Sequence, residues 1–118
     1  MESPASLVAV ERLASLAQPH RLAAFRLLVA AGPAGLPAGE IGVRLDMPAS
    51  TLSFHLAHLR RAGLVSQRRD GRSLIYTADF AAMGALVSYL TENCCGGATD
   101  CIGDTQCATA EPKERQVA

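Results

Sequence analysis

The 118-residue sequence predicts a mainly helical fold that carries one small β-hairpin. Apolar residues recur at helical spacing along most of the chain, and two short extended segments flank Asp70-Gly71, a dipeptide typical of tight hairpins. The composition agrees, because 49% of the residues are hydrophobic and only 4% are aromatic. Such a core is built from Leu, Val, Ile and Ala, which suits packed helices in a single domain.

Three helices are expected in the first part of the chain. The first covers residues 5–17, the second runs from Pro19 to about Ala31, and the third covers residues 38–45. Each repeats apolar residues every three or four positions, so each has one face suited to a core. The glycines and proline of residues 32–35 end the second helix.

A fourth helix and a hairpin follow. Ser50 is expected to cap this helix, and Gly63 to end it. Its leucines repeat at i, i+4 and i+7: Leu52, Leu56 and Leu59. Residues 64–69 and 73–77 then form two strands, joined at Asp70-Gly71 by a turn expected to be of type I′.

The last helix is expected over residues 79–93. It is apolar on two sides, so one side is expected to face a second subunit. Gly96-Gly97 should break it, and the remaining residues contain few large apolar side chains, which predicts a flexible tail. The organisation is therefore a folded domain over residues 1–93, followed by a cysteine-containing segment and tail over residues 94–118.

Positive charge is concentrated in the middle of the chain, although the formal net charge is zero. Between Arg44 and Tyr76 six arginines face two acidic residues, Asp46 and Asp70. Such an excess is typical of a surface that binds phosphates. A solvated charged face would explain the charge equally well if it were the only evidence.

Two short helices joined by a tight turn, and then a hairpin with arginines at its tip, are typical of a winged helix-turn-helix. In that arrangement the second helix lies in the major groove of DNA while the hairpin reaches neighbouring phosphates. The candidate contacts to bases or phosphates are Ser50, Thr51, Ser53 and His55. The candidate contacts to phosphates are Arg60, Arg61, Arg68, Arg69 and Arg72. His55 has an equally good second interpretation as a partly buried, hydrogen-bonded residue. His58 is expected to be a surface residue, and Arg21 is expected to form structural ion pairs rather than to touch DNA.

These residues resemble the ArsR/SmtB family of metal- and metalloid-responsive repressors. Residues 17–22, AQPHRL, look like the family's A-D-P-T-R-L, and residues 50–65, STLSFHLAHLRRAGLV, are similar to its S-T-V-S-H-H-L-x-x-L-R-x-A-G-L-V. Residues 69–76, RDGRSLIY, resemble its R-x-G-R-x-x-x-Y. The chain departs from the family at Ala49, where many members are polar, and at Phe54, where many have His.

The resemblance implies a homodimer joined through its first and last helices. Such a dimer binds a two-fold-symmetric operator in double-stranded DNA and represses a resistance or homeostasis operon; it is not an enzyme. Two known sensing sites of the family are missing from the sequence. The third helix has no Cys-x-Cys pair, and the last helix lacks the Asp-x-His pair and later His of a zinc site.

The four cysteines all lie within residues 94–107, and they predict a site for a soft ion. Cys94 and Cys95 are adjacent, Gly96-Gly97 lets the chain turn, and Cys101 can return as a third ligand. Trivalent arsenic takes three sulfurs in a pyramid, so arsenite is the expected inducer, with antimonite fitting equally well. A four-sulfur zinc or cadmium site that adds Cys107, and a cysteine tail without a ligand, stay open as alternatives.

The expected location is the cytoplasm, because the N-terminus has no signal-peptide pattern and no apolar run is long enough for a membrane span. In that reducing compartment clustered cysteines favour metal binding or redox sensing over structural disulfides. A thiol enzyme is disfavoured, because no Cys-x-x-Cys motif or nearby histidine would activate these thiols. A repressor of the same fold that senses oxidation is the remaining alternative.

Overall fold

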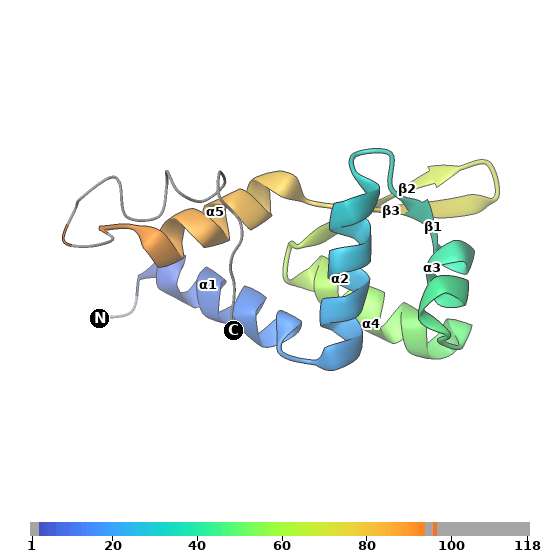
Figure 1. Cartoon of the computed structure of the whole chain (residues 1–118), viewed down its shortest axis with the longest axis horizontal. Helices are drawn as coiled ribbons and strands as arrows, with labels where there is room; N and C mark the ends of the chain where they lie inside the picture. The colour runs from blue at the N-terminus through green and yellow to red at the C-terminus, as the bar shows by residue number, and fades with distance from the viewer. Residues whose placement is uncertain (1–2, 94–95, 97–118) are drawn as a thin grey trace, which may run out of the picture. The chain divides into compact units, whose positions relative to one another are not determined.

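The computed structural model describes residues 3–93 and 96 (Figure 1). Its elements, in chain order, are α1 (Pro4–Leu16), α2 (Pro19–Ala31), β1 (Leu36–Pro37), α3 (Ala38–Leu45), α4 (Ala49–Arg61), β2 (Val65–Asp70), β3 (Ser73–Ala78) and α5 (Phe80–Thr91). Five helices and one small sheet confirm the predicted fold class. All four cysteines, and with them nearly all of the predicted segment 94–118, lie outside the described residues.

Local capping explains where the first two helices begin. The Ser3 side chain accepts a hydrogen bond from the backbone N–H of Ser6 at the start of α1. At the start of α2 the Gln18 Oε1 atom accepts from the N–H groups of His20 and Arg21, at 2.8 and 3.0 Å. Proline occupies the first helical position in both helices, where its missing N–H is not needed.

The start of α4 differs from the prediction that Ser50 caps it. The helix begins at Ala49, and its N-cap residue is Pro48, which makes no side-chain hydrogen bond. The backbone carbonyl of Pro48 already accepts from the N–H of Leu52 at 2.9 Å, so the first turn closes before Ser50. Ser50 therefore lies within the first turn, and its side chain is exposed.

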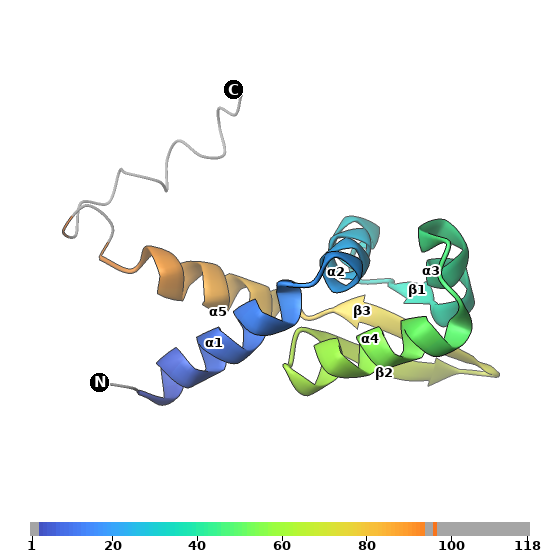
Figure 2. The same ribbon diagram turned by 90° about the horizontal axis from the view of Figure 1, so that it is seen from below.

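The core lies between α2, α3, α4 and the sheet, which Figure 2 shows grouped together. Its fully buried large side chains are leucines and one isoleucine: Leu28, Ile41, Leu56, Leu59 and Leu64. Leu52, Leu56 and Leu59 form the inner face of α4, as their spacing predicts. Burying this apolar surface orients α4 so that its opposite face is turned to solvent.

The sheet has three strands, whereas the sequence predicted only two. Its order is β1-β3-β2, and β1 pairs antiparallel with β3 through Leu36 opposite Tyr76 and Pro37 opposite Ile75. Gly35 leads into β1 with a positive φ of 73°, and a Cβ atom there would collide with the carbonyl oxygen of Tyr76. Glycine is thus required for this close approach, which joins the middle of β3 to the loop after α2.

The hairpin turn is centred one residue later than expected. Asp70 pairs with Ser73, so the two turn residues are Gly71 and Arg72. Gly71 has a positive φ of 65°, and Arg72 does not have one. A type I′ turn needs positive φ at both positions, so this pattern is that of a type II′ turn with glycine first. The register places Arg72 at the tip.

Helix α1 is joined to the C-terminal end of α4 and leaves an apolar side exposed. The Arg12 Nε atom donates to the carbonyl oxygen of Ala62 at 3.0 Å. Leu7, Val10 and Leu13 are 55%, 59% and 42% exposed. Among the described helices none has the length and apolar character needed to cross a membrane.

Candidate nucleic-acid interface

A tight turn between α3 and α4 sets the angle of the second helix. Asp46 ends α3 in the left-handed conformation, and the N–H of Met47 donates to the carbonyl oxygen of Gly42 at 2.9 Å. A Cβ atom on Gly42 would lie 3.2 Å from the Met47 carbonyl oxygen, so a larger residue would press against the turn. This is the helix-turn-helix geometry in which the second helix presents its outer face.

The outer face of α4 brings together most of the predicted base-contacting residues. Ser50, Thr51 and Ser53 are exposed, and Phe54 joins them with 60% of its side chain accessible. Arg60 and Arg61 are exposed at the C-terminal end of the helix. The start of α4 therefore offers small polar groups to a ligand, and its end offers positive charge.

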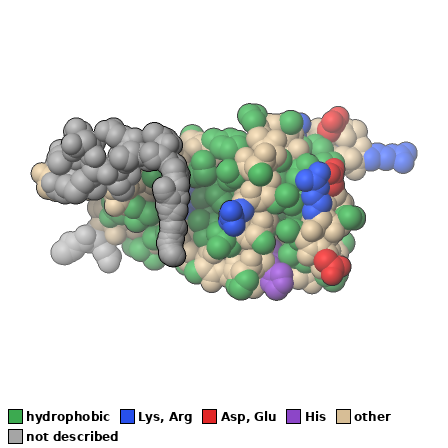
Figure 3. Space-filling view, viewed as in Figure 1, with side chains coloured by type: hydrophobic (Ala, Val, Ile, Leu, Met, Phe, Trp, Pro, Cys, Tyr) green, Lys and Arg blue, Asp and Glu red, His purple; other side chains and the backbone are tan. Residues whose placement is uncertain are grey.

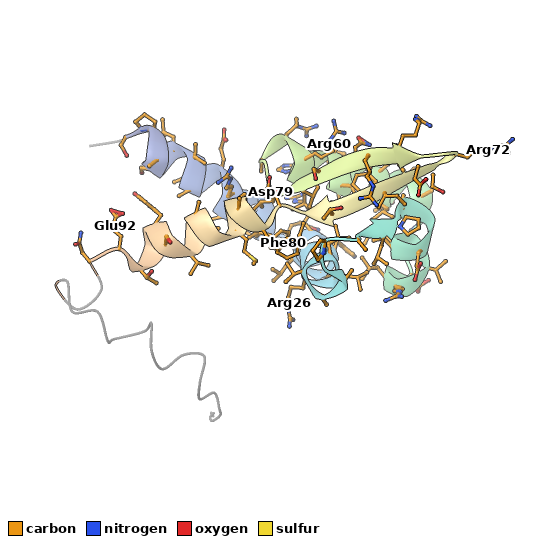
Figure 4. All side chains as sticks on the ribbon, turned by 90° about the horizontal axis from the view of Figure 1, so that it is seen from above. Arg26, Arg60, Arg72, Asp79, Phe80 and Glu92 are labelled. Carbon is orange, nitrogen blue, oxygen red and sulfur yellow. The ribbon has the colours of Figure 1, made fainter. Side chains whose placement is uncertain are left out.

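The hairpin carries the other predicted cationic side chains, and all of them are exposed: Arg68, Arg69 and Arg72. Figure 4 shows Arg72 reaching out from the hairpin tip, and Figure 3 shows a basic side chain extending from that end of the molecule. Arg68 is partly held, because its Nη2 atom donates to the carbonyl oxygen of Ala34 at 3.3 Å. Neighbouring strand residues point to opposite faces, so Arg68 and Arg69 extend from different sides of the hairpin.

One arginine of the predicted basic stretch is neutralised by a partner. Arg44 forms a salt bridge with Glu40, one turn earlier on α3. Arg44–Glu40 is the one salt bridge within residues 3–93, so the hairpin arginines and those at the end of α4 have no acidic partner in that part of the chain. Within the predicted basic stretch, the positive charge without such a partner therefore lies on α4 and the hairpin and not on α3.

His55 lies behind the outer face of α4, and its side chain is only 7% exposed. Its Nδ1 atom is 3.4 Å from Nη1 of Arg21, and its ring stacks on that of His20 with centroids 5.5 Å apart. Arg21 also donates to the carbonyl oxygen of Ser15 at 2.7 Å. These contacts support the interpretation of His55 as a buried, hydrogen-bonded residue, whereas its direct contact with DNA stays a prediction.

This environment lowers the pKa of His55 below its usual value. Burial is the main cause, and the positive charge of Arg21 adds to it, followed by His20 and His58. A guanidinium has no acceptor atom, so the contact with Arg21 requires the Nδ1 lone pair and hence a neutral imidazole. Arg21 thus has a structural role, although through hydrogen bonds and not the predicted ion pair.

A hollow of about 820 Å³ lies beside the N-terminal half of α4, between α3, the turn and β3. Its walls are mainly apolar, with Val43, Leu52 and Leu74 among the lining residues. It offers few groups that could bind a phosphate.

No site for a metal ion is formed by the part of the chain that the structure describes. Within it, His, Cys, Asp and Glu side chains do not gather in groups of three or more that could hold an ion. The predicted ligands Cys94, Cys95 and Cys101 lie outside this part, as does Cys107.

Comparison with known proteins agrees with this geometry. Residues 16–68 match a family model described as a helix-turn-helix domain. The chain is 31% identical over 83 residues to the transcriptional regulator YgaV of Escherichia coli, an alignment that covers 70% of this chain and 82% of YgaV. Solved structures described as ArsR-like and possible ArsR-family regulators are also similar to it. The chain belongs to the ArsR-like family of helix-turn-helix transcriptional regulators.

A second relative of this ArsR-like regulator is the transcriptional activator HlyU of Vibrio cholerae. Identity is 40% over 55 residues, and this alignment spans about half of each protein, 47% of this chain and 51% of HlyU. The solved structure of HlyU superimposes with a TM-score of 0.64 at 33% identity, over 79% of this chain and 98% of HlyU. A structure of reduced HlyU matches with a TM-score of 0.57 at 30% identity, over 74% and 90% of the two chains.

Two further solved structures are similar to the ArsR-like regulator. One is the homodimeric winged helix-turn-helix domain of Mb0332 from Mycobacterium bovis, with a TM-score of 0.58 and 29% identity over 73% of this chain and 80% of that one. The other is a possible transcriptional regulator for arsenical resistance, with a TM-score of 0.60 and 28% identity over 68% and 80%. The winged helix-turn-helix fold is therefore confirmed.

The sequence interpretation did not include Phe54 in the candidate interface, although it is exposed there. It lies three and four positions after Thr51 and Ser50, which places all three side chains on one helical face. That spacing was visible in the sequence. An apolar residue in a helix is ordinarily assigned to the core, however, and only the packing shows that it is turned outward.

Proposed function

We propose that this regulator is a cytoplasmic, homodimeric repressor of a metalloid-resistance operon. In this proposal, arsenite or antimonite binds Cys94, Cys95 and Cys101 and releases the protein from its operator. The observation that carries the release step is that every thiol of the chain lies within residues 94–107, directly after a domain equipped to bind DNA.

The DNA contacts follow from the exposed surface of α4 and the hairpin. Ser50, Thr51 and Ser53 are short polar groups at the start of α4. The start of a recognition helix is the part that contacts base edges in the major groove. The arginines that have no acidic partner within residues 3–93 lie at the end of α4 and on the hairpin, and they suit phosphates, which dominate the affinity for DNA. DNA is the ligand that uses both kinds of group at once.

The dimer is supported by the apolar side of α1, where Leu7, Val10 and Leu13 are exposed. An apolar stripe on an end helix is the kind of surface that an isologous contact buries. The solved Mb0332 domain is described as homodimeric. Sedimentation at micromolar concentration should give a dimer with and without arsenite; a monomer would contradict this part of the proposal.

Arsenite suits three thiols because trivalent arsenic is thiophilic and pyramidal. As each sulfur bonds to arsenic, its proton leaves with a hydroxide of arsenous acid as water, and no oxidation state changes. One solved structure similar to this chain is titled a possible regulator for arsenical resistance. For release, the ion must bind the DNA-free protein more tightly, by about 1–3 kcal/mol of coupling free energy.

The decisive experiment follows the release of operator DNA by fluorescence anisotropy during titration with arsenite, antimonite, zinc and cadmium. Replacing Cys94, Cys95 or Cys101 singly by Ser should leave DNA binding intact and abolish release by arsenite. Cys107→Ser is the matched control and should respond nearly as the wild type does. If the Cys101 variant still leaves DNA at the wild-type arsenite concentration, the three-sulfur site is wrong.

Two alternatives have distinct outcomes in the same experiment. Release by zinc or cadmium that requires Cys107 would favour a four-sulfur metal site. Release by peroxide, with a mass that shows a disulfide and no bound arsenic, would favour a thiol-redox regulator. The structure of HlyU described as reduced makes this second alternative worth testing. A reporter gene distinguishes repression from activation, which matters because HlyU is named an activator.

A further inference from the structure

Phe54 is a large apolar side chain in the middle of the polar outer face of α4. Its exposure of 60% contrasts with that of the leucines on the inner face of the same helix, which are at most 3% exposed. Ser50 and Thr51 lie one turn before it, and they are exposed as well. A solvent-facing aromatic ring in this place contributes little to the core.

The ring is held by two histidines of the same helix. Its centroid lies 5.5 Å from that of His55 and 6.5 Å from that of His58, with interplanar angles of 66° and 67°. These are edge-to-face arrangements within the favourable range for aromatic pairs. His55 is fixed by Arg21, and His58 by a hydrogen bond of 3.2 Å between its Nδ1 atom and Ser15 Oγ. The ring is therefore presented in a defined direction.

The chemistry of the major groove restricts what such a ring can recognise. Base pairs present hydrogen-bond donors and acceptors there, and the C5-methyl group of thymine is the apolar feature among them. A phenyl ring placed over the polar edge of another base would displace the water that is hydrogen-bonded to that edge. Because the ring offers no hydrogen bonds in exchange, this displacement costs free energy.

We propose that Phe54 packs against a thymine methyl group and thereby selects a T·A pair in each half-site of the operator. The inference rests on the proposed binding of α4 in the major groove. A rise of 1.5 Å per residue puts Phe54 about 4.5–6 Å along the helix from Ser50 and Thr51. With a base-pair spacing of about 3.4 Å, the thymine lies about one or two pairs from the pair that those residues face.

The test uses the full chain and no metal ion, so it does not depend on the cysteine site. Duplexes that the wild-type protein selects from a randomised library first define its site. Each conserved thymine is then replaced by uracil, which removes only the methyl group, and affinity is measured by anisotropy. Loss of one buried methyl contact should weaken binding about fourfold per half-site, and about fifteenfold when both half-sites are changed.

Two variants and a control assign the effect to Phe54. Phe54→Ala should bind the thymine and uracil duplexes equally well. Phe54→Leu should keep part of the wild-type difference in affinity between the two duplexes. Val43→Ala is the control, because it shortens an apolar side chain of α3 that is 80% exposed. This variant should keep the full wild-type difference in affinity between the two duplexes.

Three results would overturn the proposal. The first is wild-type binding of the selected duplex that no uracil replacement weakens. The second is a uracil penalty that is the same in Phe54→Ala as in the wild type. The third is a Phe54→Ala variant that changes oligomeric state while its base preference is unchanged, which would place Phe54 in a protein contact. A failure of DNA binding itself would instead appear as no selected sequence, and it would end this inference and the proposed function together.

Discussion

The two faces of α4 serve different purposes although they belong to the same helix. On the inner face Leu52, Leu56 and Leu59 are buried and join α4 to α2, α3 and the sheet. On the outer face short polar groups and Phe54 are exposed, and the Phe54 ring packs edge-to-face on the neighbouring histidines. Stability and recognition can therefore be changed separately in this helix, because no residue of one face has to contribute to the other.

The largest effect is expected on the inner face. Leu59→Ala creates a cavity at a site with no exposed surface, so the free energy of unfolding should fall by about 2–5 kcal/mol. Phe54→Ala removes a larger apolar side chain from the same helix, but an exposed one, and should change the free energy of unfolding by less than about 0.5 kcal/mol. Urea denaturation at one fixed protein concentration measures both. Similar losses in the two variants would refute the separation of the two faces.

A smaller effect is expected on the charged surface that continues the outer face. Arg69→Ala and Arg72→Ala should each weaken binding to all DNA sequences and lower the salt slope by about one unit per phosphate contact removed. Arg44→Ala is the matched control, and its slope should stay unchanged because Glu40 already neutralises that charge. A salt slope that falls in the Arg44 variant, or stays constant in both hairpin variants, would show that the DNA-binding surface lies elsewhere on the protein.

The smallest effect is expected at His55, which lies between the two faces. Its folded-state pKa is lowered, by burial first and then by Arg21, so the unfolded chain takes up a proton more readily. Stability should therefore be at its full value above pH 6.5, the approximate pKa of an unperturbed histidine, and should decline as the pH falls below it. His55→Gln should show a flatter stability profile between about pH 5 and 7 in thermal denaturation. An equally steep profile in that variant would assign the pH dependence to other groups.

Most of the fold could be predicted because its signals are local. The leucine spacing of α4, Pro19 at the start of α2 and the glycine-containing hairpin turn depend only on near neighbours. The short strand β1 was missed because two residues show no alternation, and its pairing with β3 joins positions 38 and 40 residues apart. The predicted cap at Ser50 was wrong because Pro48 already supplies the extended residue that precedes the helix.

The candidate site was predicted less completely, since charge and burial depend on packing. Counting arginines included Arg44 in the basic surface, although the spacing of Glu40 and Arg44 at i and i+4 already indicates a pair. The burial of His55 could not be deduced from its own helix, because the groups that cover it, Arg21 and His20, come from α2. The cysteine site stays a prediction.

Strand β1 has a consequence for the entropy of binding. Through it the middle of the hairpin is joined to the loop after α2, and Arg68 adds a hydrogen bond to Ala34 in that loop. A two-stranded hairpin alone is only marginally stable in water. With a third strand paired to the middle of β3, the hairpin has much of its order before it meets a ligand, so less conformational freedom is lost on association. In the proposed complex, its arginines contact the phosphate backbone from a hairpin that is already paired.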